Sequence, residues 1–118
     1  MASFAQQNLW TQVFDYYMPF ALMGDCAAQF EIAEIWRHRY KCQTLAFYWY
    51  CRSAKGGHHK AAMTAAIMSL TAQPPDFSSA LKWADIAIKG DIKGAKLVQK
   101  LVHRHATSAY RHQIDRAI

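Results

Sequence analysis

The sequence predicts an all-α fold, a short α-α superhelix (solenoid) of about three helical hairpins with roughly six helices. Two observations predict it. The pattern at residues 49–61 recurs at spacings of 33 and 34 residues, and apolar residues follow helical rather than strand spacing along the chain. Hairpins that repeat at this period are too small to bury their own apolar faces, so they stack on one another. We expect a single domain over residues 1–118.

The repeat is visible at aromatic and small-residue positions. It contains the series Tyr16, Trp49, Trp83 and the series Ala28, Ala61, Ala95. These offsets divide the chain into units at about 8–39, 40–72 and 73–106, with a C-terminal capping extension at 107–118. Since short loops make consecutive helices antiparallel, each unit is expected to be one hairpin.

Helical spacing and stop signals define the expected elements. The first helix covers 8–22, where Pro19 predicts either a kink or a second start near Met18. The next helices are expected at about 26–39, 44–55 and 58–69, and Gly56 with Gly57 is expected to end the helix at 44–55. Residues 28, 32, 33, 35 and 36 should face inward in the second helix.

The loop at 73–76 separates the last unit from the rest of the chain. Asp76 or Ser78 is expected to cap the helix that follows it, and Gly90 to end that helix. A final helix is expected from Asp91 into the region of His105.

Three segments of the repeat resemble a known family. They are W-Y-x-x-x-A-x-x-G-x-x-x-A at 49–61, G-D-C-A-A-Q-F at 24–30 and A-L-K-W at 80–83. They are similar to Sel-one-like repeats, relatives of the tetratricopeptide repeat, over roughly residues 10–105. The resemblance implies an all-helical scaffold or adaptor that holds other proteins on its concave surface, often in bacterial signalling or envelope assembly.

The chain departs from that family at two junctions and at one small-residue position. The junctions at 40–44 and at Pro74 and Pro75 lack the usual glycine-containing loop. Lys100 stands where the earlier units have Ala33 and Ala66, and a lysine in a tight helix crossing has a large desolvation cost. We therefore expect that face of the third unit to be open to solvent, as in a terminal cap.

Composition restricts the class of protein. With 53% hydrophobic and 19% charged residues the chain is globular, and its N-terminus and apolar runs fit neither a secretory signal nor a membrane span. A cytoplasmic protein with no membrane association is expected. The three cysteines at 26, 42 and 51 are expected to be reduced and mostly packed, although Arg52 beside Cys51 leaves open a lowered thiol pKa.

Charge is distributed unevenly along the chain. Residues 1–36 contain four acidic residues and no Lys or Arg, whereas residues 37–118 contain 14 basic and 4 acidic residues and carry +10. On the last helix, cations project within a sector of about 80° and form a basic stripe. Its members are Lys93, Lys96, Lys100, Arg104 and Arg111. The stripe indicates either docking of an anionic partner or a solvated face that keeps the protein soluble.

Metal and cofactor chemistry has little support in the sequence. The pairs His58 with His59 and His103 with His105 point in different directions on a helix, so neither pair chelates one ion, and the first pair is expected to be exposed at a helix start. No metal and no cofactor is expected. Glu31 and Glu34 lie one turn apart but are interpreted as an exposed face, so the chain is not expected to be an enzyme.

Aromatic residues divide into two groups. Trp49 and Trp83 recur with the repeat and are expected to fill the core between helices. Phe4, Trp10 and Phe14 precede the first full unit. They either seal the N-terminal end or offer a patch for self-association.

The function predicted from these patterns is a protein-protein interaction scaffold or adaptor. The expected partner is a protein, possessing an acidic segment, bound in the groove lined by the first helix of each hairpin. The predicted partner-binding residues are Gln29, Lys60, Thr64, Lys93, Lys96, Lys100 and Arg104. The alternative is a nucleic-acid-binding helical protein that uses the basic later units, although no recognition motif for nucleic acid is present.

Overall fold

A computed structural model describes residues 4–105, with side chains from residue 9 onward. Six helical segments follow one another, namely α1 (Phe4–Leu22), α2 (Cys26–His38), α3 (Gln43–Lys55), α4 (His59–Leu70), α5 (Phe77–Lys89) and residues 95–105. The described range holds no strand. The all-α prediction is confirmed.

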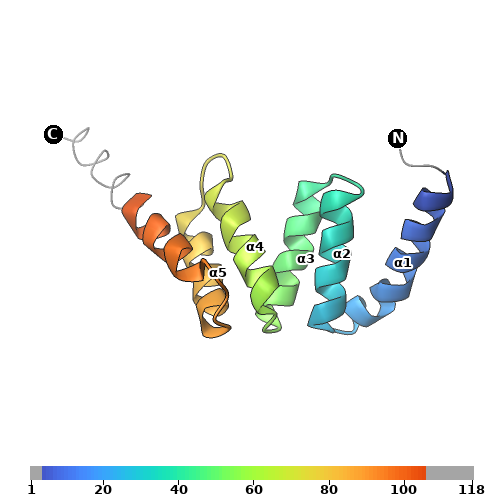
Figure 1. Cartoon of the computed structure of the whole chain (residues 1–118), viewed down its shortest axis with the longest axis horizontal. Helices are drawn as coiled ribbons and strands as arrows, with labels where there is room; N and C mark the ends of the chain where they lie inside the picture. The colour runs from blue at the N-terminus through green and yellow to red at the C-terminus, as the bar shows by residue number, and fades with distance from the viewer. Residues whose placement is uncertain (1–3, 106–118) are drawn as a thin grey trace.

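The helices form a row of three hairpins, in which α1 to α5 each pack against the next helix along the chain (Figure 1). In Figure 1 the turns within the hairpins, near Gly24, near Gly57 and at 90–94, all lie along the lower edge. The two connections between hairpins, at 39–42 and 71–76, lie along the upper edge. The first hairpin is α1 with α2, the second α3 with α4, and the third α5 with residues 95–105.

Helix α1 is longer than expected and runs through Pro19. It begins at Phe4, and the expectation of a second start near Met18 is wrong. The proline removes one N–H donor, but its own carbonyl still accepts from the Met23 N–H at 3.1 Å. Pro19 is exposed, so its ring displaces nothing in the core, and Figure 1 shows the last turns of α1 leaning toward the start of α2.

Side-chain caps fix where three helices begin. The Asp25 carboxylate accepts from the N–H groups of Ala27 and Ala28. Of the two predicted caps of α5, Asp76 is the one observed, and it accepts from Ser79 N–H. His58 was expected inside its helix, but it is the N-cap of α4, where its Nδ1 accepts from a backbone N–H. Each of these side chains satisfies donors that a helix start would otherwise leave unpaired.

The final helix begins at 95 and not at the expected Asp91. Residues 91–94 form a turn in which Asp91 has φ 53° and Gly94 has φ 88°. Two left-handed residues so close together prevent a right-handed helix from starting earlier. Asp91 occupies the repeat position of Gly24 and Gly57, which have φ 101° and 99° and adopt this conformation at lower cost.

The core is built largely from alanine. Buried alanines occur in every helix, and their small side chains allow neighbouring helices to approach closely. Trp49 and Trp83 retain 6% and 4% of their exposure, which confirms them as core residues. In α2 the inward prediction is confirmed for residues 28, 32, 33 and 35, while Trp36 is half-buried. Within the described range, no helix combines the length and the apolar character that crossing a membrane requires.

Candidate interaction surface

Gln29 does not belong to a partner-binding surface. It is 3% exposed, and its side-chain amide donates to the Ala21 carbonyl at 3.0 Å. The bond satisfies a carbonyl at the end of α1, which is a structural role within the first hairpin. The expectation that Gln29 is open to a partner is therefore wrong.

The other predicted binding residues are on the surface, but on helices other than those expected. Lys60 and Thr64 belong to α4, Lys93 to the turn at 91–94, and the remaining cations to the helix at 95–105. These elements are the second helices of their hairpins or the turns before them. None lies on α1, α3 or α5, the first helices that were expected to line the groove. Arg111 lies outside the described residues.

Contacts at the turn of the third hairpin bring part of this set together. A Cβ on Gly90 would lie 2.0 Å from Cγ of His59, and a Cβ on Gly94 would lie 3.4 Å from the Met63 terminal methyl. The turn at 90–94 therefore packs beside the first turns of α4. Lys60 and Lys93 are exposed on these two adjoining segments.

Three more exposed cations lie on the helix at 95–105, which directly follows this turn. Lys96, Lys100 and Arg104 are exposed, and Ala95, Val98 and Val102 are buried on the opposite side of the same helix. The five exposed cations are called the basic end. They are Lys60, Lys93, Lys96, Lys100 and Arg104.

Lys100 occupies a repeat position that is buried in the two earlier units. The aligned residues Ala33 and Ala66 are both 0% exposed. Lys100 is exposed, as expected for a residue with a large desolvation cost. The repeat thus retains its frame in the third unit while its last face becomes charged.

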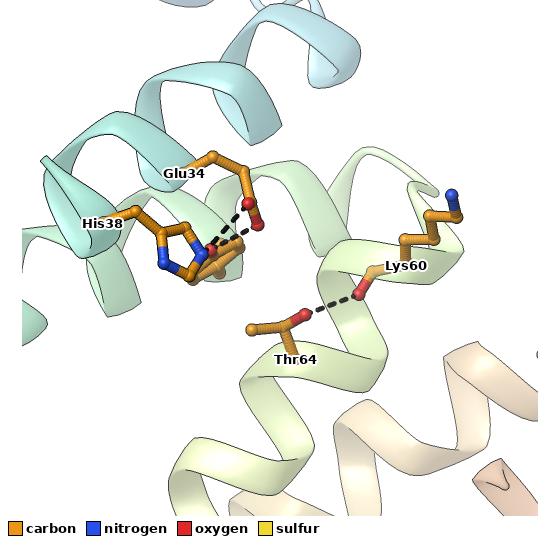
Figure 2. Close-up of polar contacts among 5 residues, drawn as sticks. Glu34, His38, Lys60 and Thr64 are labelled. Carbon is orange, nitrogen blue, oxygen red and sulfur yellow. Dashed lines mark hydrogen bonds and ion pairs between the residues drawn. The ribbon is translucent and has the colours of Figure 1, made fainter.

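The Thr64 hydroxyl is less available to a partner than its predicted role in binding requires. Its hydroxyl donates to the Lys60 carbonyl at 3.1 Å, one turn earlier in α4 (Figure 2). This is a bond within the helix, which leaves only the hydroxyl lone pairs for a partner. In the same view the Lys60 ammonium points away from both Thr64 and the Glu34 cluster, and Lys60 is exposed.

Glu34 corrects the interpretation of Glu31 and Glu34 as one exposed face. Glu31 is exposed, but Glu34 is half-buried, accepts a hydrogen bond from Tyr50 Oη at 2.6 Å, and pairs with His38 Nε2 at 3.2 Å (Figure 2). Burial and then the bond to Glu34 raise the pKa of Tyr50 well above its usual value of 10.0. This cluster joins α2 to α3.

A second group of cations lies on the first helices, and sequence reasoning missed it. The Arg52 guanidinium is 4.9 Å from the Trp49 ring centre, and the Lys82 ammonium is 4.7 Å from that of Trp83. The signal was present in the sequence, since Lys82 directly precedes Trp83 and Arg52 follows Trp49 by three residues, about one helical turn. The first-helix cations are Arg52, Lys55, Lys82 and Lys89.

Cys51 lies between these cations but is not activated by them. Burial raises the pKa of its thiol to about 11, against the smaller lowering effects of Lys55 and Lys82. The possibility of a lowered pKa is therefore wrong, and Cys51 is a packed, protonated thiol at neutral pH. All three cysteines are free.

The N-terminal aromatic residues pack within the chain. Phe14 meets the Trp36 ring edge-on at 5.6 Å, and the Arg39 guanidinium lies 3.9 Å from the Trp10 ring centre. Both contacts join α1 to the end of α2, which supports sealing rather than self-association for these two residues. The side chain of Phe4 lies outside the described part of the structure.

His58 is less exposed than expected, whereas His59 is on the surface. The His58 ring stacks on Phe30 at 4.5 Å, and burial lowers its pKa from 6.5, with smaller contributions from His59 and Lys60. Among the described residues, no three His, Cys, Asp or Glu side chains gather as metal ligands would.

Comparison with known proteins gives no match: no family model, no curated protein and no solved structure is significantly similar to the chain. The resemblance to Sel-one-like repeats therefore remains a prediction. Function has to be argued from the surface itself.

Proposed function

We propose that the chain is a non-catalytic scaffold that binds an acidic segment of a partner protein at the basic end. The observation that supports this proposal is the lack of internal partners for its cations. Over the described residues, the one ion pair is that between Glu34 and His38, so no lysine or arginine there is neutralised by a carboxylate of the chain. A surface with this charge attracts anions.

The scaffold can bind without first having to order itself. The basic end is held by helix 95–105 and the start of α4, and the turn at 90–94 packs between them. Positions on packed helices keep their spacing, so less conformational entropy is lost when a partner binds. Exposed cations mainly raise the association rate and make the affinity dependent on salt.

The test uses a fluorescein-labelled peptide rich in glutamate, with binding followed by fluorescence anisotropy. Lys96→Glu with Lys100→Glu is expected to weaken binding at least about tenfold, because two attractive charges become repulsive. Lys55→Glu with Lys82→Glu is the matched control, since it changes the net charge equally on the first helices. Its effect should be about threefold or less at about 150 mM salt, where distant charges are screened.

Three outcomes would contradict the proposal. Unchanged binding in the Lys96 and Lys100 variant removes the basic end as the site. A larger loss in the Lys55 and Lys82 variant moves the site to the first helices. Tighter binding of a DNA or RNA oligonucleotide than of the acidic peptide, with a steep loss between about 50 and 200 mM salt, favours the nucleic-acid alternative.

A further inference from the structure

A pocket of about 540 Å³ lies at the edge of the second hairpin opposite the Gly57 turn. The end of α2, the start of α3, the end of α4 and the loop after it form its walls. Phe47, Ile67 and Met68 give it an apolar lining. Its volume is within the range of pockets that hold ligands.

The repeat explains why a hollow exists at this place. Moving back 33 residues turns Phe47 into Phe14 and Ser69 into Trp36. In the first hairpin the Trp36 indole packs edge-on against Phe14, with ring centres 5.6 Å apart, and contacts Tyr40 at 5.2 Å. The second hairpin has the same phenylalanine but only a serine opposite it. The pocket therefore lies where the first hairpin holds an indole ring.

Ser69 does not itself occupy the space. Its hydroxyl donates to the Ala65 carbonyl at 2.9 Å, one turn earlier in α4, and the residue is 3% exposed. Ile67, in contrast, is 41% exposed at the pocket, so part of this aliphatic side chain is open to solvent there. An apolar group entering here would cover Ile67 and complete the packing that Trp36 completes in the first hairpin.

The pocket is lined by hydrogen-bond acceptors for an indole N–H, which the surroundings of Trp36 lack. The Trp36 Nε1 donor is buried without a hydrogen-bond partner in the described structure. Gln43, Thr44 and Asp76 line the pocket and contribute side-chain oxygen acceptors. A buried indole normally finds an acceptor, so the second hairpin can satisfy the ring better than the first.

We propose that this pocket takes a tryptophan side chain from a partner protein, seated beside Phe47 as Trp36 is seated beside Phe14. The inference rests on the proposed function in one respect, that the partner is a polypeptide. The volume exceeds that of one ring, and Arg37 and Thr71 also line the pocket, so flanking peptide groups have polar contacts available. In such interfaces an aromatic anchor in a pocket supplies much of the affinity, whereas exposed charges elsewhere mainly raise the association rate.

The test uses acetyl-Gly-Trp-Gly-amide, its alanine counterpart and free indole as probes, with the full chain labelled for amide NMR spectra. The tryptophan peptide is expected to shift the amide signals of residues 47 and 69, and the alanine peptide is not. Ser69→Trp should lower affinity for the tryptophan peptide at least about tenfold, because the new ring fills the pocket. Leu97→Trp, at an exposed position of the helix at 95–105, is the matched control and should bind the tryptophan peptide as the original chain does.

A second variant covers the case in which Ser69→Trp does not fold. Phe47→Leu keeps an apolar side chain but removes the ring edge, and it should weaken the tryptophan peptide while circular dichroism remains unchanged. Equal binding of the tryptophan and alanine peptides, or full binding by a folded Ser69→Trp chain, overturns the proposal. If free indole binds but the tryptophan peptide does not, the proposal is also overturned, since the site would then serve a small molecule.

The two proposals fail separately. The Lys96→Glu and Lys100→Glu chain should lose the acidic peptide but still bind the tryptophan peptide. The Ser69→Trp chain should show the reverse. If the acidic peptide binds nowhere while the tryptophan peptide binds at Phe47, the proposed basic end is wrong and the pocket stands.

Discussion

The two junctions between hairpins use the same repeat positions with different chemistry. At the first junction, α3 hydrogen-bonds to α2: Tyr50 Oη donates to Glu34, and Ser53 Oγ donates to the Cys26 carbonyl, both at 2.6 Å. At the second, the positions of Tyr50 and Ser53 are occupied by Ala84 and Ala87, each 0% exposed. One junction is polar and directional, and the other depends on apolar packing.

Close approach is common to both junctions, but the clearance differs. Gly56 and Gly90 end α3 and α5, and each lies against the first residue of the preceding second helix. A Cβ at Gly56 would be 3.1 Å from Cys26 Cβ, whereas one at Gly90 would be 2.5 Å from His59 Cβ and 2.0 Å from its Cγ. The junction without hydrogen bonds is therefore the tighter one. Packing and hydrogen bonding are alternative ways to hold the same geometry.

The largest expected effect comes from Gly90→Ala. The new methyl group would overlap His59, so the junction must open, and the free energy of unfolding should fall by about 2 kcal/mol in urea titrations. Gly56→Ala is the matched variant at the first junction and should cost about 1 kcal/mol or less. Both glycines have φ near −80° to −90°, so backbone strain does not enter the comparison.

Removing the His59 side chain tests whether its overlap with the new methyl group causes the stability loss in Gly90→Ala. His59→Gly combined with Gly90→Ala is expected to recover most of the lost stability, because the overlapping atoms are gone. Equal losses for Gly56→Ala and Gly90→Ala would show that the two junctions have the same clearance, against this comparison.

An intermediate effect is expected from the junction hydrogen bond. Ser53→Ala should lower the free energy of unfolding by about 1 kcal/mol, since it removes the donor to the Cys26 carbonyl. Ala87→Ser places a hydroxyl at the position of the second junction that aligns with Ser53. Since His59 aligns with Cys26, the new hydroxyl would be expected to donate to the His59 carbonyl. It should be nearly neutral if that bond forms. A loss of about 1 kcal/mol or more in Ala87→Ser would mean that the second junction cannot adopt the polar arrangement.

The smallest effect concerns the pH dependence of stability. Burial lowers the pKa of His58 from 6.5, so the unfolded chain binds this proton more readily than the folded one. The stabilisation by neutral His58 is complete above pH 6.5 and is lost as pH falls through the lowered value. His58→Asp restores the cap used by Asp25 and should reduce the fall in melting temperature between about pH 7 and pH 5.5.

A matched histidine change separates this effect from general titration. His103→Asp alters an exposed histidine and should leave the slope of melting temperature against pH near that of the original chain. If His58→Asp and the original chain have the same slope, protonation of His58 does not contribute.

The fold was predictable because the repeat can be recognised from the order of residues alone, without knowing which helices are in contact. Tyr16, Trp49 and Trp83 align by counting residues, and the helices around Trp49 and Trp83 lie within a residue or two of their expected bounds. Asp76 was recognisable as a cap because capping depends on neighbours three residues away. The start of the last helix was missed because Asp91 adopts a left-handed conformation that glycine favours and aspartate only tolerates.

The binding surface was only partly predictable. The basic stripe was found by projecting one helix, and its cations on 95–105 are exposed as projected. Gln29 was misplaced because its burial depends on the Ala21 carbonyl of another helix, eight residues away. The pocket beside Phe47 could not be foreseen from either helix alone, since it results from Ser69 on α4 facing a phenylalanine on α3.

By itself the sequence determined the helical repeat, its period and the basic charge of its later units, because periodicity, turns and charge depend on residue order alone. Only the tertiary structure decided which side chains those helices cover. Tyr50 hydrogen-bonds to Glu34, Gly90 packs against His59, and a pocket lies beside Ser69 where the first hairpin has Trp36. Each depends on the distance between two helices, which packing sets and no single helix encodes.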